Sequence, residues 1–310
     1  MILKVLKGLG IMLFLFFFVS EVTSVVVTLE HDYVRTAYAK EITVDGYPMF
    51  YRESGEDHEE TILLIHGWLG SSYDYIRVLE ALDDQYHVVA PDLMGFGLSE
   101  KSLTFDYAKA NQASQMAKFL EVLNIDNVIV MGHSMGGDIA IHLAADFPLL
   151  VRQLILISPA VIASEGSGGP NAPAPDFFYD WILNNYYLQK AFFMTAYSSF
   201  EVEYELVTYD FYDEMYIVNK TIPGSVMREW TLDNDSGAGE AKLAFITQPV
   251  NLIWGTDDGF VPYEHAAMIQ DKLIAAEAVQ IYTMNQAGHL PFDTFFESFM
   301  MNVEEGLMRK

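Results

Sequence analysis

Six short apolar runs recur along the chain, and most of them end at a glycine or a proline. A continuous apolar run of six or seven residues is typical of a strand buried on both faces of a sheet. The runs span residues 61–67, 87–92, 127–132, 153–159, 249–255 and 278–284. Helical spacing of apolar residues falls between or after them, over residues 72–83, 106–123, 135–146, 262–274 and 292–308. This alternation predicts an α/β fold, with a mostly parallel central sheet and helices on both of its faces.

The chain has 310 residues, of which 51% are hydrophobic, so it can bury a large core. Two strand-like runs within residues 40–54 meet at Asp45-Gly46, a dipeptide typical of a β-hairpin turn. This hairpin is expected to add an antiparallel edge to the sheet. The chain shows no long flexible linker and no internal repeat. One large domain that carries an insertion is therefore expected, rather than two domains.

The alternation of strands and helices stops between residues 160 and 242. This stretch begins with the turn-forming sequence SEGSGGPNAPAP and closes with the loop sequence DNDSGAGE. The segments between these loops look helical and are dense in phenylalanine, tyrosine and tryptophan. We interpret residues 160–242 as a helical cap inserted into the sheet, which divides the α/β core into residues 25–159 and 243–310.

Residues 1–24 differ in kind from the rest of the chain. Lys4 and Lys7 precede an apolar run over residues 9–19, and a basic start before a short apolar core is typical of an export signal cleaved here after Ser24. The run is shorter than the roughly 20 apolar residues of a membrane-spanning helix, although residues 25–29 extend it. A cleaved signal peptide, an uncleaved membrane anchor and a buried helix remain open. The first two predict a protein that is exported (secreted or periplasmic) or anchored in a membrane facing outward.

The chain has no cysteine and a formal charge of −26. The first property excludes disulfides and thiolate metal sites. The second argues against a nucleic-acid partner, because phosphates attract basic surfaces. The sequence shows no His-x-His or His-Glu-x-x-His motif and no G-x-G-x-x-G motif after a strand. Neither a metal nor a dinucleotide cofactor is therefore expected.

Ser134 lies in the sequence Gly-His-Ser-Met-Gly-Gly, directly after the apolar residues 128–130 and directly before a helical pattern. A serine at a sharp turn from strand to helix, with small residues two positions to either side, forms a G-x-S-x-G nucleophile elbow. The turn leaves no room for side chains at Gly132 and Gly136. It presents the serine hydroxyl at the N-terminus of the helix, where the helix dipole favours an anion. The sequence therefore predicts that Ser134 is a nucleophile.

Five motifs in order resemble those of the α/β-hydrolase fold superfamily, of the serine esterase and lipase sort. They are HGWLG at 66–70, PDLMGFGLS at 91–99, GHSMGG at 132–137, WGTDDGFVP at 254–262 and AGHLP at 287–291. The resemblance covers the chain from about residue 41 to its C-terminus. It is specific for the fold and the catalytic machinery, and much less specific for the substrate. It implies an α/β-hydrolase fold with an inserted helical cap, a catalytic triad and no cofactor.

A serine hydroxyl needs a general base, and the resemblance implies the chain order serine, acid, histidine. Of the eight histidines, only His265 and His289 stand late enough in the chain. His265 falls inside a predicted helix too soon after the acid loop, whereas His289 follows the last strand. His289 is therefore assigned as the base, while His133 and His66 are expected to shape the elbow and the oxyanion loop.

The acid that orients the imidazole is expected in the loop after residues 249–255, which contains Asp257 and Asp258. In sequences that resemble WGxxDxxVP, the acid stands three residues before the valine, which makes Asp258 the acid here. Asp257 remains the alternative and is otherwise expected to be a turn or capping residue. Asp92 is expected to stabilise a scaffold turn.

Two backbone N–H groups are expected to bind the oxyanion of the tetrahedral intermediate. One belongs to the residue after the nucleophile, Met135, and the other to the loop after the first buried strand. The resemblance to other HG loops implies Trp68 for this second donor. The indole of Trp68 is also expected to line the pocket.

These residues predict a serine hydrolase that cleaves carboxylic esters. Epoxide hydrolases and haloalkane dehalogenases of the same superfamily attack with an aspartate at the elbow, and their oxyanion loop usually carries a proline that HGW lacks. The alternative enzyme is a carbon–carbon bond hydrolase of ring-cleavage products, which more often has asparagine where His133 stands. A non-catalytic binding protein on the same fold is the alternative of another class, but such proteins usually lose a member of the triad.

The composition of the predicted cap indicates the substrate class. Aromatic side chains over Ser134 are expected to form an apolar pocket, and the remainder to form the cap's own core. Acidic side chains on the outer face are expected to repel anionic substrates and lipid surfaces. The predicted substrates are therefore neutral esters of small to medium size. The aromatic residues are Phe177, Phe178, Trp181, Tyr186, Tyr187, Phe192, Phe193, Tyr197, Tyr209, Phe211, Tyr212 and Trp230, and the acidic ones are Glu201, Glu203, Glu205, Asp210, Asp213 and Glu214.

Overall fold

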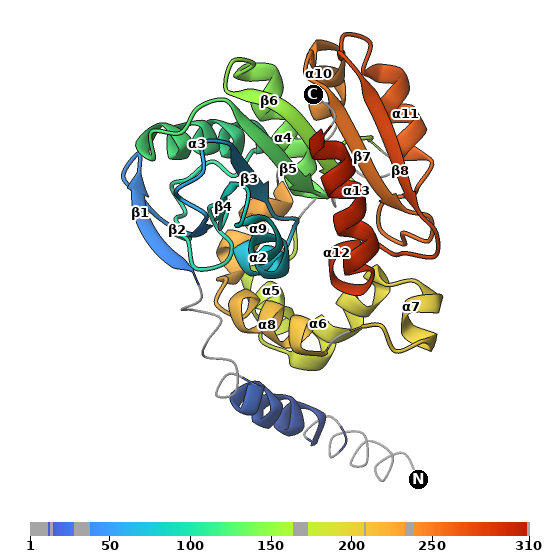
Figure 1. The fold of residues 1–310 in the computed structure, drawn as a ribbon. Coiled ribbons are helices and arrows are strands. Elements are labelled where there is room, and N and C mark those ends of the chain that lie inside the picture. The colour runs from blue at the N-terminus through green and yellow to red at the C-terminus, as the bar shows by residue number, and fades with distance from the viewer. Residues whose placement is uncertain are drawn as a thin grey trace.

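The computed structural model describes residues 12, 15–27, 38–163, 173–207, 209–232 and 238–308. Lys4 and Lys7, and most of the two loops predicted at the ends of the cap, lie outside the described residues. The described part contains an eight-stranded sheet with the strand order β1-β2-β4-β3-β5-β6-β7-β8 (Figure 1). The strands are β1 (Ala39–Val44), β2 (Tyr47–Ser54), β3 (Thr61–Ile65), β4 (His87–Pro91), β5 (Val128–His133), β6 (Val151–Ile157), β7 (Val250–Gly255) and β8 (Val279–Met284).

The antiparallel edge predicted from the sequence is confirmed. β1 pairs with β2 across Asp45 and Gly46, which have φ angles of 54° and 86°. Two consecutive positive φ angles match the tight hairpin turns that favour Asp-Gly. β2 lies antiparallel to β4, whereas β4, β3, β5, β6, β7 and β8 run parallel to their neighbours. The fold class is therefore α/β with a mostly parallel sheet, as predicted.

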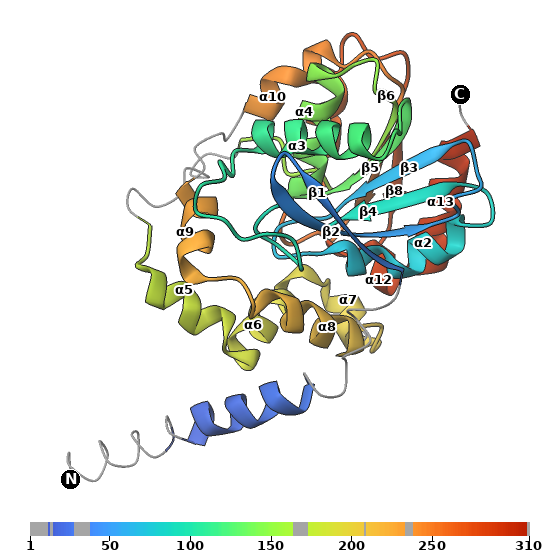
Figure 2. The same cartoon turned by 90° about the vertical axis from the view of Figure 1, so that its left-hand side faces the viewer.

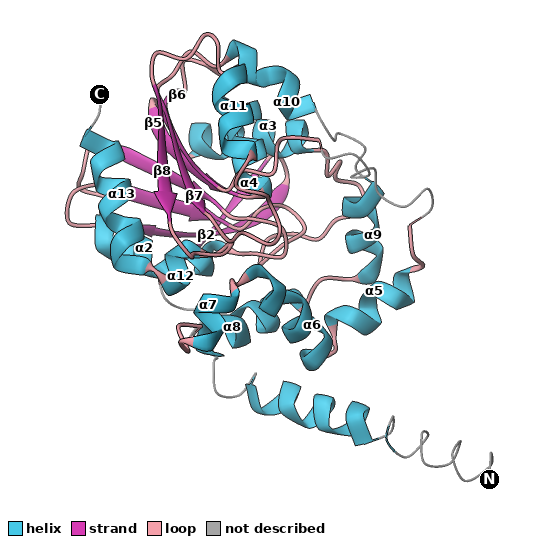
Figure 3. Ribbon diagram, turned by 90° about the vertical axis from the view of Figure 1, so that its right-hand side faces the viewer, coloured by secondary structure: helices cyan, strands magenta, loops and turns pink. Residues whose placement is uncertain are grey.

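Helices cover both faces of the sheet, as Figure 2 and Figure 3 show. One face is covered by α3 (Lys109–Val122), α4 (Met135–Asp146), α10 (Ala238–Lys242) and α11 (His265–Lys272). The other face is covered by α2 (Ile76–Leu82), α12 (Pro291–Thr294) and α13 (Phe296–Met308). Because helices shield both faces, β3, β5 and β7 are buried along their whole length. This explains why these strands are apolar runs without alternation.

A separate group of helices lies at one end of the sheet, between β6 and β7 in the chain (Figure 1). We call this group the cap. It comprises α5 (Asp176–Leu183), α6 (Tyr186–Phe193), η3 (Met194–Ala196), α7 (Ser199–Glu203), α8 (Tyr209–Asn219) and α9 (Gly224–Leu232). The cap is joined to the core by polar contacts as well as by packing, because the Asn219 amide on α8 donates to the Leu69 carbonyl (2.8 Å).

Some of the cap's aromatic residues form its own core, as expected. Tyr186, Tyr212 and Trp230 are buried, and the ring of Tyr186 lies edge-on to Tyr212 at 5.2 Å between centroids. Others are exposed: Phe177 is 72% accessible and Trp181 is 44% accessible. The side chain of Tyr209 lies outside the described residues. The cap therefore has an aromatic core and also an exposed aromatic face.

The expected distribution of acidic residues over the cap is wrong in part. Glu203 and Glu205 are exposed, but Glu201 and Glu214 are buried. Asp213 is half-buried and accepts a hydrogen bond from the Tyr186 hydroxyl (2.7 Å). Charged residues are rarely buried without partners, and Glu201 accepts hydrogen bonds both from nearby Ser198 and from distant Gly288. The side chain of Asp210 lies outside the described residues.

A helical segment over residues 15–27 packs against the cap from outside (Figure 2). The Phe17 ring contacts Trp181 at 6.3 Å between centroids, and Lys220 on α8 donates to the Ser24 hydroxyl. The opposite side of the segment is apolar and exposed, with Phe18 and Val25 both 58% accessible. Within the described ranges, no helix combines the length and the apolar character needed to cross a membrane.

Candidate active site

Ser134 occupies a sharp turn between β5 and α4, where the sequence predicted a nucleophile elbow. β5 ends at His133, α4 begins at Met135, and Ser134 itself has φ 52° and ψ −119°. A positive φ is rare for a residue with a side chain and clusters at functional sites. The two flanking glycines allow the turn: a Cβ at Gly132 would lie 2.5 Å from the Gly136 carbonyl oxygen.

His289 and Asp258 form a hydrogen-bonded pair. The distance from His289 Nδ1 to Asp258 Oδ2 is 2.7 Å, and the two side chains are 5% and 0% exposed. The other carboxylate oxygen of Asp258 accepts the backbone N–H groups of Phe260 (2.9 Å) and Val261 (2.8 Å). An ionised carboxylate has no hydrogen to donate and can only accept hydrogen bonds. His289 Nδ1 therefore carries the proton in this pair, and His289 Nε2 is free to accept one.

The alternative acid, Asp257, and the other candidate base, His265, are not part of this hydrogen-bonded pair. Asp257 is exposed and accepts a hydrogen bond from the Thr256 hydroxyl (3.1 Å). His265 is the first residue of α11 and does not line the cavity that contains His289. Of the two acids that the sequence left open, the structure therefore brings Asp258 to His289.

A cavity of about 260 Å³ brings these side chains together. Its wall includes both Ser134 and His289, together with groups from the oxyanion loop and the cap. No hydrogen bond joins the Ser134 hydroxyl to His289 among the described residues; in unliganded sites such bonds are often long and shorten when substrate binds. The cavity is lined by Gly67, Trp68, Asp74, His133, Ser134, Phe192, Phe193, Ala196, Met215, Phe260, His289 and Leu290.

The loop after β3 lies directly against the serine. A Cβ at Gly67 would lie 3.3 Å from the Ser134 Cβ. In the part of the chain that the structure describes, the N–H groups of Trp68 and Met135 donate no hydrogen bond. An oxyanion hole requires two backbone donors that are free to bind the substrate, and the assignment of Trp68 and Met135 to this role stays a prediction.

His66 holds this loop in place. Its Nε2 accepts from the Leu93 N–H (2.9 Å), so its Nδ1 carries the proton and donates to the Gly67 carbonyl (2.8 Å). Burial lowers the pKa of His66, which favours this neutral form. Asp92 fixes the neighbouring turns by accepting the N–H groups of Ser72 and Leu98 (both 2.6 Å).

His133 supports the loop of the base. Its Nε2 donates to the backbone carbonyl of His289 (2.9 Å). Burial, followed by repulsion from His289, lowers the pKa of His133 well below its usual range. His133 is therefore neutral and acts as a fixed hydrogen-bond donor, in agreement with the structural role expected for it.

Asp74 is a cavity residue that the sequence did not reveal. It lies in η2 (Ser72–Tyr75), just after the oxyanion loop, and lines the cavity beside Ser134. Burial raises the pKa of Asp74 well above its usual range, and the nearby charges of Asp92 and Glu214 act in the same direction. The raised pKa favours the uncharged form of this carboxyl beside Ser134. The sequence around Asp74 gives no signal for this position, because acidic residues are common in the first turn of a helix.

Glu201 was expected on the outer face of the cap, and this expectation is wrong. Glu201 is buried against the loop that contains His289. One of its carboxylate oxygens accepts the N–H groups of Ser198 (2.6 Å) and Gly288 (3.0 Å). The other oxygen accepts the hydroxyl of Thr294. Gly288 directly precedes His289, so Glu201 ties the cap to the residue next to the base.

Two further contacts join the same parts of the chain. The His289 N–H donates to the Ala196 carbonyl (2.7 Å), and the Ser198 hydroxyl donates to the Gln286 carbonyl (2.6 Å). The turn at the start of α7 therefore holds the loop of residues 286–289 from one side. The position of His289 depends on the cap as well as on the core.

Replacing Glu201 with alanine should lower the free energy of unfolding by about 2 kcal/mol or more. The change leaves the buried N–H groups of Ser198 and Gly288 without their acceptor, and each buried donor so stranded costs about 1–3 kcal/mol. Urea denaturation followed by circular dichroism measures the loss. Glu203→Ala, on the exposed face of the same helix, is the matched control and should stay within about 0.5 kcal/mol of the wild type. Equal effects of the two substitutions would show that Glu201 is not a buried anchor.

The described residues contain no group of three histidine, aspartate or glutamate side chains placed to bind a metal ion. The arrangement can instead supply a serine hydroxyl, a base with its acid, and two backbone donors at one point of the cavity.

Comparison with known proteins identifies the family of the chain. The family described as "alpha/beta hydrolase fold" matches residues 60–296. The chain belongs to this family. The α/β-hydrolase is 30% identical over 265 residues to Lipase 1 of Psychrobacter immobilis, covering 79% of this chain and 76% of the lipase. The protein is therefore a hydrolase of the α/β fold.

Two solved structures share the fold of this α/β-hydrolase. The epoxide hydrolase CorEH has a TM-score of 0.73 at 23% identity, with 87% of this chain and 98% of that chain covered. The structure of a membrane phospholipase A, described as a bacterial virulence factor, has a TM-score of 0.71 at 20% identity, with 99% of this chain and 98% of that chain covered. At these identities the likeness concerns the fold alone.

Proposed function

We propose that the protein is a serine hydrolase that cleaves carboxylic esters through an acyl-enzyme on Ser134. One observation carries the proposal: a serine at a strained elbow shares a cavity with a histidine whose Nδ1 is bonded to a buried aspartate. Similarity to a lipase over 79% of this chain supports ester substrates. An aspartate at the elbow, which an epoxide hydrolase of this superfamily would use, is absent, because residue 134 is a serine.

In the proposed reaction, His289 Nε2 takes the proton of the Ser134 hydroxyl as its oxygen attacks the ester carbonyl. The N–H groups of Trp68 and Met135 stabilise the oxyanion of the tetrahedral intermediate. His289 then returns the proton to the departing alcohol. A water molecule, deprotonated by the same imidazole, attacks the acyl-enzyme; the bond to Ser134 breaks, the Ser134 oxygen takes the proton back from His289, and the carboxylic acid leaves. Asp258 keeps the imidazole oriented and stabilises its charged form.

The catalytic cavity supports neutral substrates of small to medium size. Its volume of about 260 Å³ lies just below the usual range of about 300–1,000 Å³ for ligand pockets. Most of its wall is apolar, and no lysine or arginine from the described residues lines it. An anionic acyl group would therefore enter without a counter-charge, which makes charged acyl donors poor substrates.

A series of p-nitrophenyl esters with increasing acyl length tests this proposal. We expect turnover of neutral esters, with kcat/KM rising over the first few carbons, because each buried methylene contributes about 0.8 kcal/mol. Esters that carry a carboxylate on the acyl chain should react much more slowly. Absence of ester turnover, together with activity on ring-cleavage diketones, would instead identify a carbon–carbon bond hydrolase. Absence of both activities would favour a binding protein.

We also propose that the protein functions outside the cytoplasm, either released or attached to a membrane through its N-terminal segment. The basic start, the apolar run and the exposed apolar side of residues 15–27 support this proposal. Exposed large apolar patches mark surfaces that contact proteins or membranes. A membrane-attached form would retain this segment.

Cell fractionation combined with N-terminal sequencing separates these outcomes. A product that starts at residue 25 in the exported fraction indicates a cleaved signal. An intact chain in the membrane fraction indicates an anchor. A soluble cytoplasmic product that starts at Met1 would refute export.

A further inference from the structure

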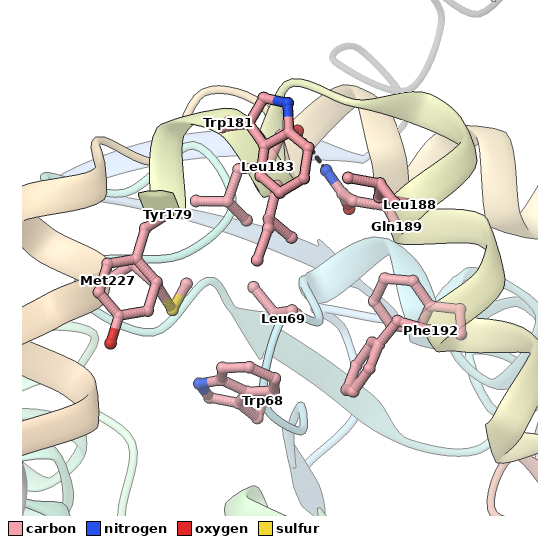
Figure 4. Close-up of a pocket in the computed structure, with 11 residues that line it drawn as sticks. Trp68, Leu69, Tyr179, Trp181, Leu183, Leu188, Gln189, Phe192 and Met227 are labelled. Carbon is pink, nitrogen blue, oxygen red and sulfur yellow. Dashed lines mark hydrogen bonds between the residues drawn. The ribbon is translucent and has the colours of Figure 1, made fainter. Parts of the chain in front are cut away.

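A second cavity lies beside the catalytic cavity, under α5, α6 and α9 (Figure 4). We call it the apolar chamber. Its volume is about 370 Å³, larger than that of the catalytic cavity. An apolar cavity of about 150 Å³ holds a benzene molecule, so the apolar chamber has room for roughly a dozen carbon atoms.

The wall of the apolar chamber offers very little to a polar ligand. No charged side chain from the described part of the chain lines it. The Tyr179 hydroxyl is engaged with the Thr231 hydroxyl (2.9 Å), and the Gln189 side-chain N–H donates to the Leu183 carbonyl. The Gln189 amide oxygen is a buried acceptor without a partner in the described part of the chain. A wall of this kind selects a hydrocarbon and would exclude a charged group.

The two cavities adjoin each other. Trp68, Phe192 and Phe193 line both of them. The rings of Trp68 and Phe192 meet edge to face, with 5.9 Å between centroids and an interplanar angle of 80°. Trp68 and Phe192 are 39% and 40% exposed as residues. This aromatic pair therefore separates the two cavities and is itself only partly buried.

The aromatic pair is continuous with the catalytic residues. Phe192 stacks on Phe260 at 5.4 Å between centroids, and Phe260 contacts the His289 ring at 5.3 Å. This row of rings links His289 to Phe192 and Trp68, which also line the apolar chamber. Figure 4 shows Trp68 and Leu69 on one side of the chamber, opposite Trp181 and Leu183 on α5.

We propose that the apolar chamber binds the distal part of a long alkyl chain of the ester substrate, which enters past Trp68 and Phe192. This inference rests on the proposed ester hydrolysis and extends the substrate class from small and medium esters to long-chain ones. Short chains fill only the catalytic cavity, whereas long chains also occupy the chamber. Each methylene that enters the chamber should raise kcat/KM by up to about fourfold until the chamber is full.

The proposal is tested by a substitution that places a larger side chain in the apolar chamber. Leu188 lines the apolar chamber and not the catalytic cavity, so Leu188→Trp should remove space for at least two methylenes. We expect the ratio of kcat/KM for p-nitrophenyl dodecanoate to that for p-nitrophenyl butanoate to fall by at least about tenfold. Val202→Trp, at an exposed position of α7 outside both cavities, is the matched control and should leave the ratio unchanged.

A second series distinguishes the two ends of the ester. Alkyl butanoates of increasing alcohol length are assayed beside the acyl series with the same two variants. A drop confined to the acyl series assigns the acyl chain to the chamber, and a drop confined to the alcohol series assigns the alcohol chain. If Leu188→Trp has the thermal unfolding midpoint of the wild type and neither ratio changes, the proposal is overturned.

Equilibrium dialysis with radiolabelled dodecan-1-ol tests the chamber without any turnover. We expect saturable binding to the wild type and to Ser134→Ala, weakened at least about tenfold by Leu188→Trp. Binding without ester hydrolysis would refute the proposed function and leave the chamber's ligand class standing. Absence of saturable binding, or equal binding by Leu188→Trp, would refute the chamber as an alkyl site.

Discussion

Ser134→Ala should abolish ester hydrolysis, lowering kcat by about 10⁵-fold or more. The hydroxyl oxygen is the atom that forms the acyl-enzyme in the proposed reaction, and alanine supplies no nucleophile in its place. The proposed oxyanion donors, the N–H groups of Trp68 and Met135, would account for any acceleration that persists over water. Steady-state and burst kinetics with p-nitrophenyl butanoate measure the loss, and the burst of p-nitrophenol should disappear.

The control for this prediction is Ser114→Ala, on α3 and outside the catalytic cavity. It should retain wild-type kcat. Ser134→Ala keeps the strained turn and loses only one oxygen atom, so its unfolding midpoint should remain close to that of the wild type. An active, folded Ser134→Ala protein would show that the nucleophile is another group.

Asp258→Asn should lower kcat by about 10³–10⁴-fold while KM changes little. Asparagine has the same shape as aspartate, but it can offer an N–H group to His289 Nδ1. The imidazole then carries its proton on Nε2, where it cannot accept the proton of Ser134. The variant loses stabilisation of the transition state rather than substrate binding, so kcat falls while KM changes little.

Asp257→Asn is the matched control, because the two residues are neighbours with the same chemistry. Asp257 is exposed and contacts Thr256 rather than His289, so its replacement should change kcat by less than about twofold. The opposite result, a damaged Asp257 variant beside an active Asp258 variant, would contradict the assignment of the acid.

The core of the fold was predictable because its signals are local. The apolar runs at 61–67 and 249–255 correspond to β3 and β7. A strand buried on both faces is typically a continuous apolar run, so its sequence alone identifies it. The hairpin at Asp45-Gly46 follows from one dipeptide. The elbow also depends on neighbouring residues only, so motif and geometry agree at Ser134.

Contacts between distant segments were not predictable. Glu201 was expected on the acidic outer face of the cap, since an isolated carboxylate on a short helix is normally solvated. Its partner Gly288 lies 87 residues further along the chain, and no spacing rule connects them. Asp74 is a similar case, because its burial depends on the cap above it.

The substrate prediction was limited in the same way. The sequence indicated an aromatic pocket over Ser134, but it could not show that Trp68 and Phe192 divide the space beneath the cap in two. The sizes of the two cavities depend on how α5, α6 and α9 pack against the loop after β3. Such packing is a tertiary property, and only the structure shows it.

The central claim is that Ser134 is the acylated nucleophile, activated by the Asp258–His289 pair. Mass spectrometry of the protein after reaction with a fluorophosphonate tests it most directly, because the probe forms a covalent bond with an activated serine. We predict one adduct per chain, on the peptide that contains Ser134, with labelling lost in Ser134→Ala and strongly slowed in Asp258→Asn. An unlabelled wild-type protein, or equal labelling of the wild type and Ser134→Ala, would contradict the account.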